Sequence, residues 1–322
     1  MAEISYEVVR YDETNFIFVT GQTASVLPHS HRELELGLVL KGQPRLRVGE
    51  ADFLLRPGSL WVVNPFESHA LRSRSIRTPY CYVALQFSLS FFRAYFPQAE
   101  HVRFAAADLS DATVGADARE QLRGLLLGAA RDYFGETPFY ALRCASRINE
   151  LMALLLERVP HAVLSDQDLR EANQRAARLR RVTDYIEEHM GEKVLLGDIA
   201  RQEGLSLAYL SHLFSAEMGM PFQSYLTGLR CRRAAALLMQ TDQSPTDISL
   251  SCGFSALKYM TRGLQERYGC TPKELRETGL GEDLARRHED DRSASRGGSR
   301  TPHTRAEALR FLERAAEIQE SN

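Results

Sequence analysis

The sequence predicts an α+β protein of two domains: a β-rich N-terminal half that forms a small barrel with flanking helices, and an all-α C-terminal half. Up to about residue 105, short runs alternate between apolar and polar residues and are separated by Pro and Gly turns, which is typical of strands. After about residue 115, the apolar residues recur at helical spacing. The length of 322 residues suits two domains.

The composition is that of an ordinary soluble protein, with 44% apolar residues, 25% charged residues and a net charge of -2. No apolar run approaches the roughly 18–20 residues that span a bilayer, and no signal pattern opens the chain. The five cysteines are odd in number and never in Cys-x-x-Cys spacing, which favours neither disulfides nor a thiolate metal site. We therefore expect a cytoplasmic protein that does not contact membranes.

The β-rich half contains three clear strand patterns, at residues 34–40, 44–49 and 80–88. A Pro-Gly turn, a short apolar strand and a second Pro-containing turn follow one another in residues 56–70. Many short strands with turns between them indicate a sandwich or a small barrel.

Two helices are predicted at residues 118–134 and 139–159. The second carries an apolar stripe formed by Leu142, Ile148, Leu151, Leu155 and Leu156. This stripe either packs on the barrel of its own chain or pairs with a second copy, and the sequence leaves both alternatives open. We place the first domain at residues 1–160 and a polar linker at residues 161–177.

The last part of the chain, residues 278–322, begins with charged and Gly/Ser-rich sequence that cannot bury enough apolar surface to become ordered. A final amphipathic helix after Pro302 could use Leu309, Leu312 and Ile318. The pattern assigns no function to this tail.

The helical half, residues 178–277, contains an internal repeat. The stretch "DIARQEGLSLAYLSHLFSAEMG" (198–219) matches "DISLSCGFSALKYMTRGLQERYG" (247–269), with one residue inserted at the start of the second long helix. Each unit reads as a short helix, a turn with a glycine (Gly204 or Gly253) and a longer helix, which is the helix-turn-helix layout. Ser206 and Ser255 are the expected N-caps of the longer helices.

Each longer helix is expected to bury one face and expose the other. We expect Tyr209, Leu210, Leu213 and Phe214 to be buried in the first unit, and Tyr259, Met260 and Leu264 in the second. The open faces then carry Ala208, Ser211 and His212 in the first unit, and Lys258, Thr261 and Arg262 in the second. Polar and cationic side chains at such positions suit contacts with base edges in the major groove.

The connecting segment, residues 221–240, reads as a helix that a proline opens. Its length of roughly 28 Å approaches the spacing of about 34 Å between successive major grooves on one side of DNA. The local charge supports DNA binding only modestly, since residues 201–276 contain nine Lys/Arg against six Asp/Glu. Arg230, Arg232 and Arg233 either contact phosphate or form a solvated helix surface.

Residues 178–276 resemble the double helix-turn-helix domain of the arabinose-regulator (AraC-type) family of bacterial transcription regulators. The stretches "YLSHLF", "GMPFQSYLTGLRCRRAAALLMQT", "ISLSCGF", "YMTRGLQERYG" and "CTPKELR" carry this resemblance as an ordered set. It implies the following DNA-contacting residues: Ser206, Leu207, Ala208, Ser211, His212, Leu257, Lys258, Thr261 and Arg262. The short side chains of the first unit put strong base readout there in doubt, so His212, Lys258, Thr261 and Arg262 are the strongest candidates.

The N-terminal half carries a polar pattern, His29-x-His31-x3-Glu35, followed by Pro65-x3-His69. It resembles the cupin-type sensor barrel that often precedes this DNA-binding domain, and in metal-dependent cupin enzymes these positions hold a transition metal. His29, His31 and Glu35 share a strand face, and the leucines at 34, 36, 38 and 40 share the other. We favour the polar face as the pocket and place the leucines under the two helices.

Three interpretations of His29, His31, Glu35 and His69 stay open: polar groups of an effector pocket, ligands of a divalent transition metal, or rim residues without a ligand. Tyr82 lies on a strand that could face the same pocket. No cofactor is required by the first interpretation.

These features predict a sequence-specific DNA-binding regulator of transcription rather than an enzyme, and the family resemblance implies an activator that responds to a small molecule such as a sugar. The expected partners are promoter or operator DNA, the effector and RNA polymerase, and a homodimer stays open. One alternative is a cupin metalloenzyme with a DNA-binding appendage, and another is a scaffold whose helical half binds only protein.

Overall fold

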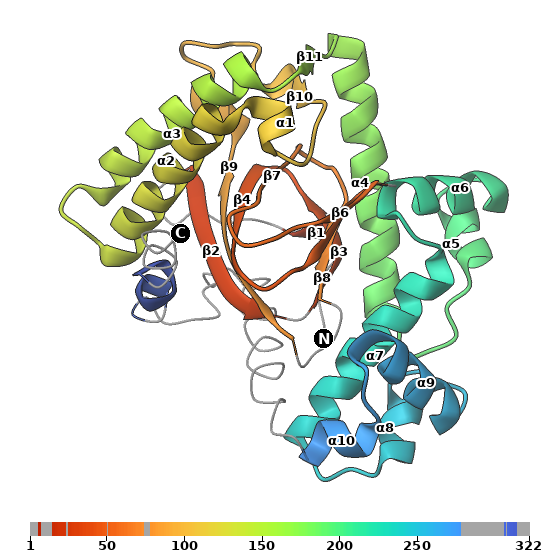
Figure 1. The fold of residues 1–322 in the computed structure, drawn as a ribbon. Coiled ribbons are helices and arrows are strands. Elements are labelled where there is room, and N and C mark those ends of the chain that lie inside the picture. The colour runs from red at the N-terminus through yellow and green to blue at the C-terminus, as the bar shows by residue number, and fades with distance from the viewer. Residues whose placement is uncertain are drawn as a thin grey trace.

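The computed structural model describes residues 6–7, 15–23, 25–49, 51–73, 78–277, 306 and 308–313. A β-barrel with helices on one side forms the N-terminal part, and short helices form the C-terminal part (Figure 1). The predicted α+β, two-domain class is therefore confirmed. Among the described residues, no helix is both long enough and apolar enough to cross a membrane.

The barrel consists of two facing sheets. Its strands are β1 (Tyr6–Glu7), β2 (Phe16–Thr23), β3 (Ser25–His31), β4 (Leu34–Lys41), β5 (Arg45–Val48), β6 (Ala51–Leu54), β7 (Leu60–Val63), β8 (His69–Arg72) and β9 (Tyr80–Phe87). One sheet has the order β1-β3-β8-β5-β6, and the other has the order β2-β9-β4-β7. The strands predicted at 34–40, 44–49 and 80–88 are confirmed as β4, β5 and β9.

The two faces of β4 contact different surroundings, as the alternation in the sequence predicts. Its leucines, Leu34, Leu36, Leu38 and Leu40, belong to a core shared with helices α2 (Ala116–Gly135) and α3 (Tyr140–Arg158). The opposite face looks into the barrel, where Val39 packs with residues of the other sheet. The polar face therefore lines the interior of the barrel, and the leucines lie under the helices.

The stripe predicted on α3 is wrong at one end. Leu142 is 73% exposed, whereas Cys144, Ile148, Leu151 and Leu155 are fully buried against the barrel. At about 100° per residue, Leu142 lies roughly 240° around the helix from Ile148, so the two cannot share one face. The stripe therefore packs on the barrel of its own chain, and Leu142 does not belong to it.

The segment between the two halves is more ordered than its composition indicates. Residues expected as a linker form β11 (His161–Val163), which pairs with β10 (Val102–Phe104), and the first half of α4 (Asp166–His189). A capping box at Ser165 and Asp168 starts α4. Shorter elements fill the path from β9 to α2, namely η1 (Leu89–Phe92), η2 (Ala99–His101) and α1 (Asp111–Val114).

The C-terminal part is built around one central helix. Its helices are α5 (Leu196–Gln202), α6 (Leu207–Met218), α7 (Phe222–Gln240), α8 (Pro245–Ser251), α9 (Leu257–Tyr268) and α10 (Pro272–Glu277). The first half of α7 packs in one core with α4, α5 and α6. The second half of α7 packs in a separate core with α8, α9 and α10. Each repeat unit therefore has its own core, and α7 is common to both.

A short helical segment near the C-terminus, residues 308–313, packs on the barrel side of the molecule (Figure 1). Ala308 and Leu312 are fully buried in the core that β4, α2 and α3 share. The predicted terminal helix is thus found in part, with Leu309 packed against the same core. Residues 278–305 and Ile318 lie outside the described residues.

Candidate functional site

Both repeat units have the predicted turn geometry. Gly204 and Gly253 have φ values of 68° and 83°, in the left-handed region that favours glycine. Ser206 caps α6, since its hydroxyl accepts a hydrogen bond from the Tyr209 N–H at 3.2 Å. Ser255 does not cap α9. The extra residue in the second unit moves the helix start by one position, so the N-cap is Ala256, which makes no side-chain cap.

The open face of α6 is exposed as predicted. Ala208, Ser211 and His212 are all exposed, and Leu207 is 53% exposed beside them. The expectation that Tyr209 is buried is wrong, because its side chain is 45% exposed. Tyr209 lies about 100° around the helix from buried Leu210, which places it at the edge of the apolar stripe. The exposed face of α6 thus includes a tyrosine.

The corresponding face of α9 carries longer and charged side chains. Lys258 and Arg262 are exposed, Thr261 is half-buried, and Leu257 packs partly against the second core. Tyr259 is 50% exposed rather than buried, and the Lys258 Nζ lies 5.0 Å from the centre of its ring. A shallow hollow of about 700 Å³ covers this face and is lined by Leu257, Lys258, Thr261, Arg262, Gln265 and Glu266.

Glu266 is a residue of this face that the sequence reasoning missed. The Arg262 Nε donates a hydrogen bond to Glu266 Oε1 at 2.7 Å, and this bond raises the pKa of the guanidinium. The i,i+4 spacing of the two residues was the signal for this pair. DNA phosphate or a guanine edge would have to compete with Glu266 for Arg262.

Arg230, a candidate for phosphate contact, instead joins parts of the helical domain. Its Nε donates to the Met190 carbonyl at 2.8 Å, and its Nη2 donates to the Glu192 carbonyl at 2.6 Å. Burial lowers the pKa of this guanidinium. The side chain therefore holds the end of α4 against α7, and the phosphate interpretation does not fit Arg230.

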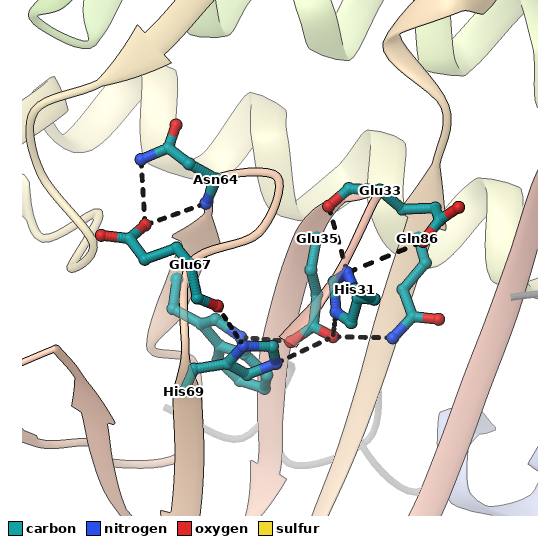
Figure 2. A network of polar contacts seen from close by, with 8 residues as sticks. His31, Glu33, Glu35, Asn64, Glu67, His69 and Gln86 are labelled. Atoms are coloured by element: carbon teal, nitrogen blue, oxygen red, sulfur yellow. Dashed lines mark hydrogen bonds and ion pairs between the residues drawn. The ribbon is translucent and has the colours of Figure 1, made fainter. Parts of the chain in front are cut away.

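Inside the barrel, the three predicted histidines lie together. Figure 2 shows two of them, His31 and His69, on either side of Glu35. His29 and His31 come from β3, and His69 comes from the paired strand β8. One ring nitrogen of each histidine lies within 4.8 Å of the other two. His31 and His69 are almost completely buried.

Glu35 faces this cluster from the opposite sheet. The prediction that it shares one strand with His29 and His31 is wrong, because the chain bends at residues 32–33, so the two histidines lie on β3 and Glu35 lies on β4. Its Oε2 lies 3.3 Å from His31 Nε2 and 3.7 Å from His69 Nε2. Two further residues hold the carboxylate: Trp61 Nε1 donates to Oε1 at 2.9 Å, and Gln86 Nε2 donates to Oε2 at 3.0 Å. Sequence reasoning missed Trp61 and Gln86, which reach Glu35 because β7 and β9 flank β4.

The hydrogen bonds of the cluster fix the protons of two rings. His31 Nδ1 lies 3.1 Å from the Glu33 carbonyl, and His69 Nδ1 lies 3.1 Å from the Glu67 carbonyl. A carbonyl oxygen only accepts, so each Nδ1 carries a proton, and in the neutral ring the Nε2 lone pair points at Glu35. Among the described residues, His69 Nε2 has no hydrogen-bond partner.

With neutral rings, acceptors would face one another across the centre of the cluster, so the arrangement requires a positive charge there, supplied either by a proton on an imidazole or by a metal ion. Burial opposes ionisation of Glu35, but the charge of His69 and the hydrogen bond with His31 outweigh it and hold the pKa of Glu35 well below its ordinary value. Three imidazoles and one carboxylate suit a divalent transition metal. The carbonyls on Nδ1 are the outer hydrogen bonds that metal-binding histidines usually make.

Tyr82 does not join the cluster. It shares a sheet face with Gln86 but lies four residues before it in β9, opposite Val39 rather than Glu35. Its ring packs near Trp61 and Tyr80, at centroid distances of 6.3 and 5.9 Å. The structure thus brings four of the five predicted pocket residues together and leaves Tyr82 apart.

Comparison with protein families agrees with both halves of the chain. The AraC-like ligand-binding domain matches residues 16–152, and a helix-turn-helix domain matches residues 199–278. Together the two matches cover about two thirds of the sequence. The chain belongs to the AraC-type family of transcription regulators. As an AraC-type regulator it combines a ligand-binding barrel with a helix-turn-helix DNA-binding domain.

Similar proteins carry matching descriptions. An uncharacterized HTH-type transcriptional regulator of Staphylococcus aureus is 25% identical over 243 residues, which are 76% of this chain and 31% of that protein. This AraC-type chain thus spans about a third of the length of that relative. The HTH-type transcriptional regulator ExsA of Pseudomonas aeruginosa is 25% identical over 259 residues, which are 77% of this chain and 87% of ExsA.

Two of the similar solved structures differ in how much of this chain they cover. The C-terminal domain of the response regulator yesN from Fusobacterium nucleatum is 33% identical, with 29% of this chain and 92% of that chain covered and a TM-score of 0.28. ToxT from Vibrio cholerae is 11% identical, with 80% and 97% covered and a TM-score of 0.43.

Proposed function

We propose that α6 and α9 contact a promoter or operator from one side of the duplex, and that an effector bound at the barrel cluster changes this contact. The observation that carries the proposal is that two matched units sit on the two halves of α7, each with its predicted polar face exposed. Since α7 is a single helix of 19 residues, roughly 28 Å long, it holds the two units at a fixed separation.

Within this proposal, α9 supplies most of the base recognition. It presents Lys258 and Arg262, which are residue types that can pair with the edge of guanine, whereas α6 presents the short side chains of Ala208 and Ser211. His212 is the longest polar side chain among the α6 candidates. The α6 unit then contributes mainly contacts with the DNA phosphate backbone, which position the protein on the duplex.

The test is the affinity of purified protein for its own upstream DNA, measured by fluorescence anisotropy. We expect Arg262→Ala to weaken specific binding by roughly 5- to 150-fold, which corresponds to a loss of about 1–3 kcal/mol. Arg201→Ala is the matched control, because Arg201 pairs with Asp198 on α5, outside the reading face. Equal affinity of both variants and the wild type would support the scaffold alternative instead.

Activation through RNA polymerase and pairing of two chains are further parts of this proposal. The excess of three positive charges over residues 201–276 gives a weak field, so a second bound copy or half-site would supply affinity. Transcription reconstituted with RNA polymerase and the upstream DNA would show the sign of regulation. Sedimentation of the protein on one-site and two-site DNA would show the stoichiometry.

A second candidate function, the binding of a divalent transition metal, is favoured by the cluster of His29, His31, His69 and Glu35. One ring nitrogen of each histidine lies within 4.8 Å of the other two, beside the carboxylate of Glu35 in a buried site, and this donor set suits a cation. When bound, such an ion would supply Lewis acidity and a fixed charge. A sugar hydroxyl has a single hydrogen, so it could instead donate to only one of these acceptors, either Glu35 or one ring nitrogen.

Metal analysis of purified protein distinguishes these ligands. We expect chelator-treated protein to take up one Zn²⁺, Mn²⁺ or Ni²⁺ per chain, with a matching rise in Tm, and His69→Gln to lose at least tenfold in affinity. His101→Gln is the control, because His101 bonds to the Leu164 carbonyl outside the cluster. Absence of stoichiometric uptake would leave the polar-effector interpretation. Turnover of a substrate by the loaded protein would support the metalloenzyme alternative.

A further inference from the structure

A cavity separate from the histidine cluster lies between the barrel and α4. Its volume is about 630 Å³, a usual size for a small-molecule site. In Figure 1, α4 runs alongside the barrel strands and continues into the helical part. The barrel lines the cavity with Arg32, Pro65, Phe66, Ser88, Leu89, Glu100 and Arg103, and α4 lines it with Leu169, Asn173, Ala177, Arg180, Arg181 and Asp184.

The chemistry of the lining selects one kind of ligand. The lining contains four arginines and two carboxylates, together with apolar residues from the barrel and from α4. We propose that this cavity binds a small organic anion, with a carboxylate or phosphate group on an apolar body. The site is additional to the barrel cluster and to the DNA-contacting helices.

The arginines are unequally neutralised, which locates the anion. Arg32 lies 3.7 Å from Glu100, Arg180 lies 3.7 Å from Asp184, and Arg181 pairs with Glu203. Within the described part of the chain, Arg103 forms no ion pair with a carboxylate. Its Nη1 donates only to the backbone carbonyls of Glu100 and Val102.

Arg103 is the lining arginine whose charge is only partly compensated. Its side chain is half-buried, and burial lowers its pKa although the charge of Glu67 acts in the opposite direction. A buried cation is costly unless an anion or several hydrogen bonds compensate it. An acidic group in the cavity beside Arg103 would supply that compensation, with Phe66, Leu89 and Leu169 around its apolar body.

The α4 side of the cavity is one face of a single helix. Leu169, Asn173 and Ala177 follow one another at i+4 spacing, and Asp184 continues the same face. In the second half of α4, Leu179, Val182 and Ile186 belong to the core of the first helix-turn-helix unit. A ligand in the cavity therefore contacts the barrel and a helix of the DNA-binding part together, so its affinity depends on how the two are arranged.

The barrel wall of the cavity also connects to the histidine cluster. Phe66 adopts φ of 65°, a left-handed conformation that is unfavourable for phenylalanine, and its N–H donates to the His31 carbonyl at 2.7 Å. Arg32 directly follows His31. Unfavourable backbone conformations of this kind concentrate at ligand-binding walls, and this one holds the Phe66 ring at the cavity.

The experiment is isothermal titration of the full chain without DNA, so its outcome is independent of the proposed DNA contact. The probes are benzoate and phenyl phosphate, which distinguish a carboxylate from a phosphate, and benzyl alcohol is the neutral comparison. We expect one site per chain and at least tenfold tighter binding of one anion than of benzyl alcohol. Arg103→Gln should weaken anion binding at least tenfold, and Ala177→Trp, which fills the cavity, should abolish it.

Matched variants on the same helix control for charge and bulk. Arg170→Gln and Gln174→Trp change exposed residues of α4 outside the cavity lining, and both should bind the anion as the wild type does. Circular dichroism on every variant verifies folding. The proposal is overturned if neither anion binds more tightly than benzyl alcohol, or if Arg103→Gln and Arg170→Gln bind alike.

Discussion

At the scale of single residues, Glu35 organises the interior of the barrel. It accepts hydrogen bonds from Trp61 and Gln86 and faces two imidazole nitrogens. The sequence pattern and the cupin resemblance predicted that Glu35 and the three histidines belong to one site, but the sequence placed His29, His31 and Glu35 on a single strand, whereas they lie on β3 and β4 in facing sheets. Trp61 and Gln86 could not be predicted in the same way, since they depend on which strands flank β4.

Gly37 leaves the space that the Trp61 ring of this network occupies. It pairs with Trp61 across the strands, and a Cβ on Gly37 would overlap the Trp61 ring, which is fully buried. We expect Gly37→Ala to displace the ring, weaken its bond to Glu35 and lower the free energy of unfolding by about 1–3 kcal/mol. Urea denaturation followed by circular dichroism measures this change.

Gly124→Ala provides the comparison for that variant. Gly124 lies within α2, and a Cβ there would meet nothing within 4 Å. Alanine is favoured over glycine inside a helix, so this change should stabilise the protein by up to about 1 kcal/mol. If Gly37→Ala also left stability unchanged or raised it, the close packing of Trp61 on Gly37 would be contradicted.

At the scale of elements, the repeat in the sequence predicted both helix-turn-helix units and the helix between them. The repeat could not predict how far the buried stripes of α6 and α9 extend, because Tyr209 and Tyr259 lie at the edges of these stripes and are about half exposed. It also could not predict that the inserted residue moves the start of α9. A shift of one residue in a helix start changes the N-cap without changing the periodicity.

The two serines of the turns should therefore respond differently to substitution. Ser206→Ala removes the hydroxyl that accepts from the Tyr209 N–H, and we expect a loss of about 0.5–2 kcal/mol in the free energy of unfolding. Ser255→Ala, at the matching position, should change stability by less than about 0.5 kcal/mol, because Ala256 is the N-cap. Thermal or urea unfolding of both variants tests this difference, and equal losses would contradict it.

At the scale of the whole molecule, the barrel touches the first DNA-binding unit directly. Arg47 on β5 donates from Nη1 to the Gly219 carbonyl at 2.8 Å, at the C-terminal end of α6. Ser68, next to His69, lies against Met218, with its hydroxyl 4.0 Å from the sulfur. A cation at the end of a helix also interacts favourably with the helix dipole.

Arg47→Gln should loosen this contact while the barrel stays folded. We expect amide hydrogens of residues 216–220 to exchange roughly tenfold faster, consistent with the loss of about 1.4 kcal/mol from a charged hydrogen bond. Hydrogen-exchange mass spectrometry gives the rates. Arg45→Gln is the control, since Arg45 lies on the same strand and pairs with Asp52 instead. Identical exchange in both variants would show that the Arg47 bond does not hold α6.

The order and type of the two domains could be predicted from sequence, since strand and helix periodicities occupy separate halves. The helix α4 could not, because residues 161–177 are polar and carry no apolar stripe, and a capping box with tertiary contacts orders them instead. The cavity beside α4 was also beyond prediction. Its walls come from segments far apart in the chain, so it exists only once the two domains are placed.

The continuity of α4 restricts which changes of length the protein can tolerate. This helix of 24 residues, roughly 36 Å long, lines the cavity with one portion and enters the α6 core with another. Each residue inserted between Ala177 and Leu179 would turn the first part of the cavity lining relative to the α6 core and to Arg180 and Asp184 by about 100°, and advance it by about 1.5 Å. Arg180 and Asp184 would keep their helix but lose their direction, so the number of residues in α4 is set by geometry as firmly as their identity.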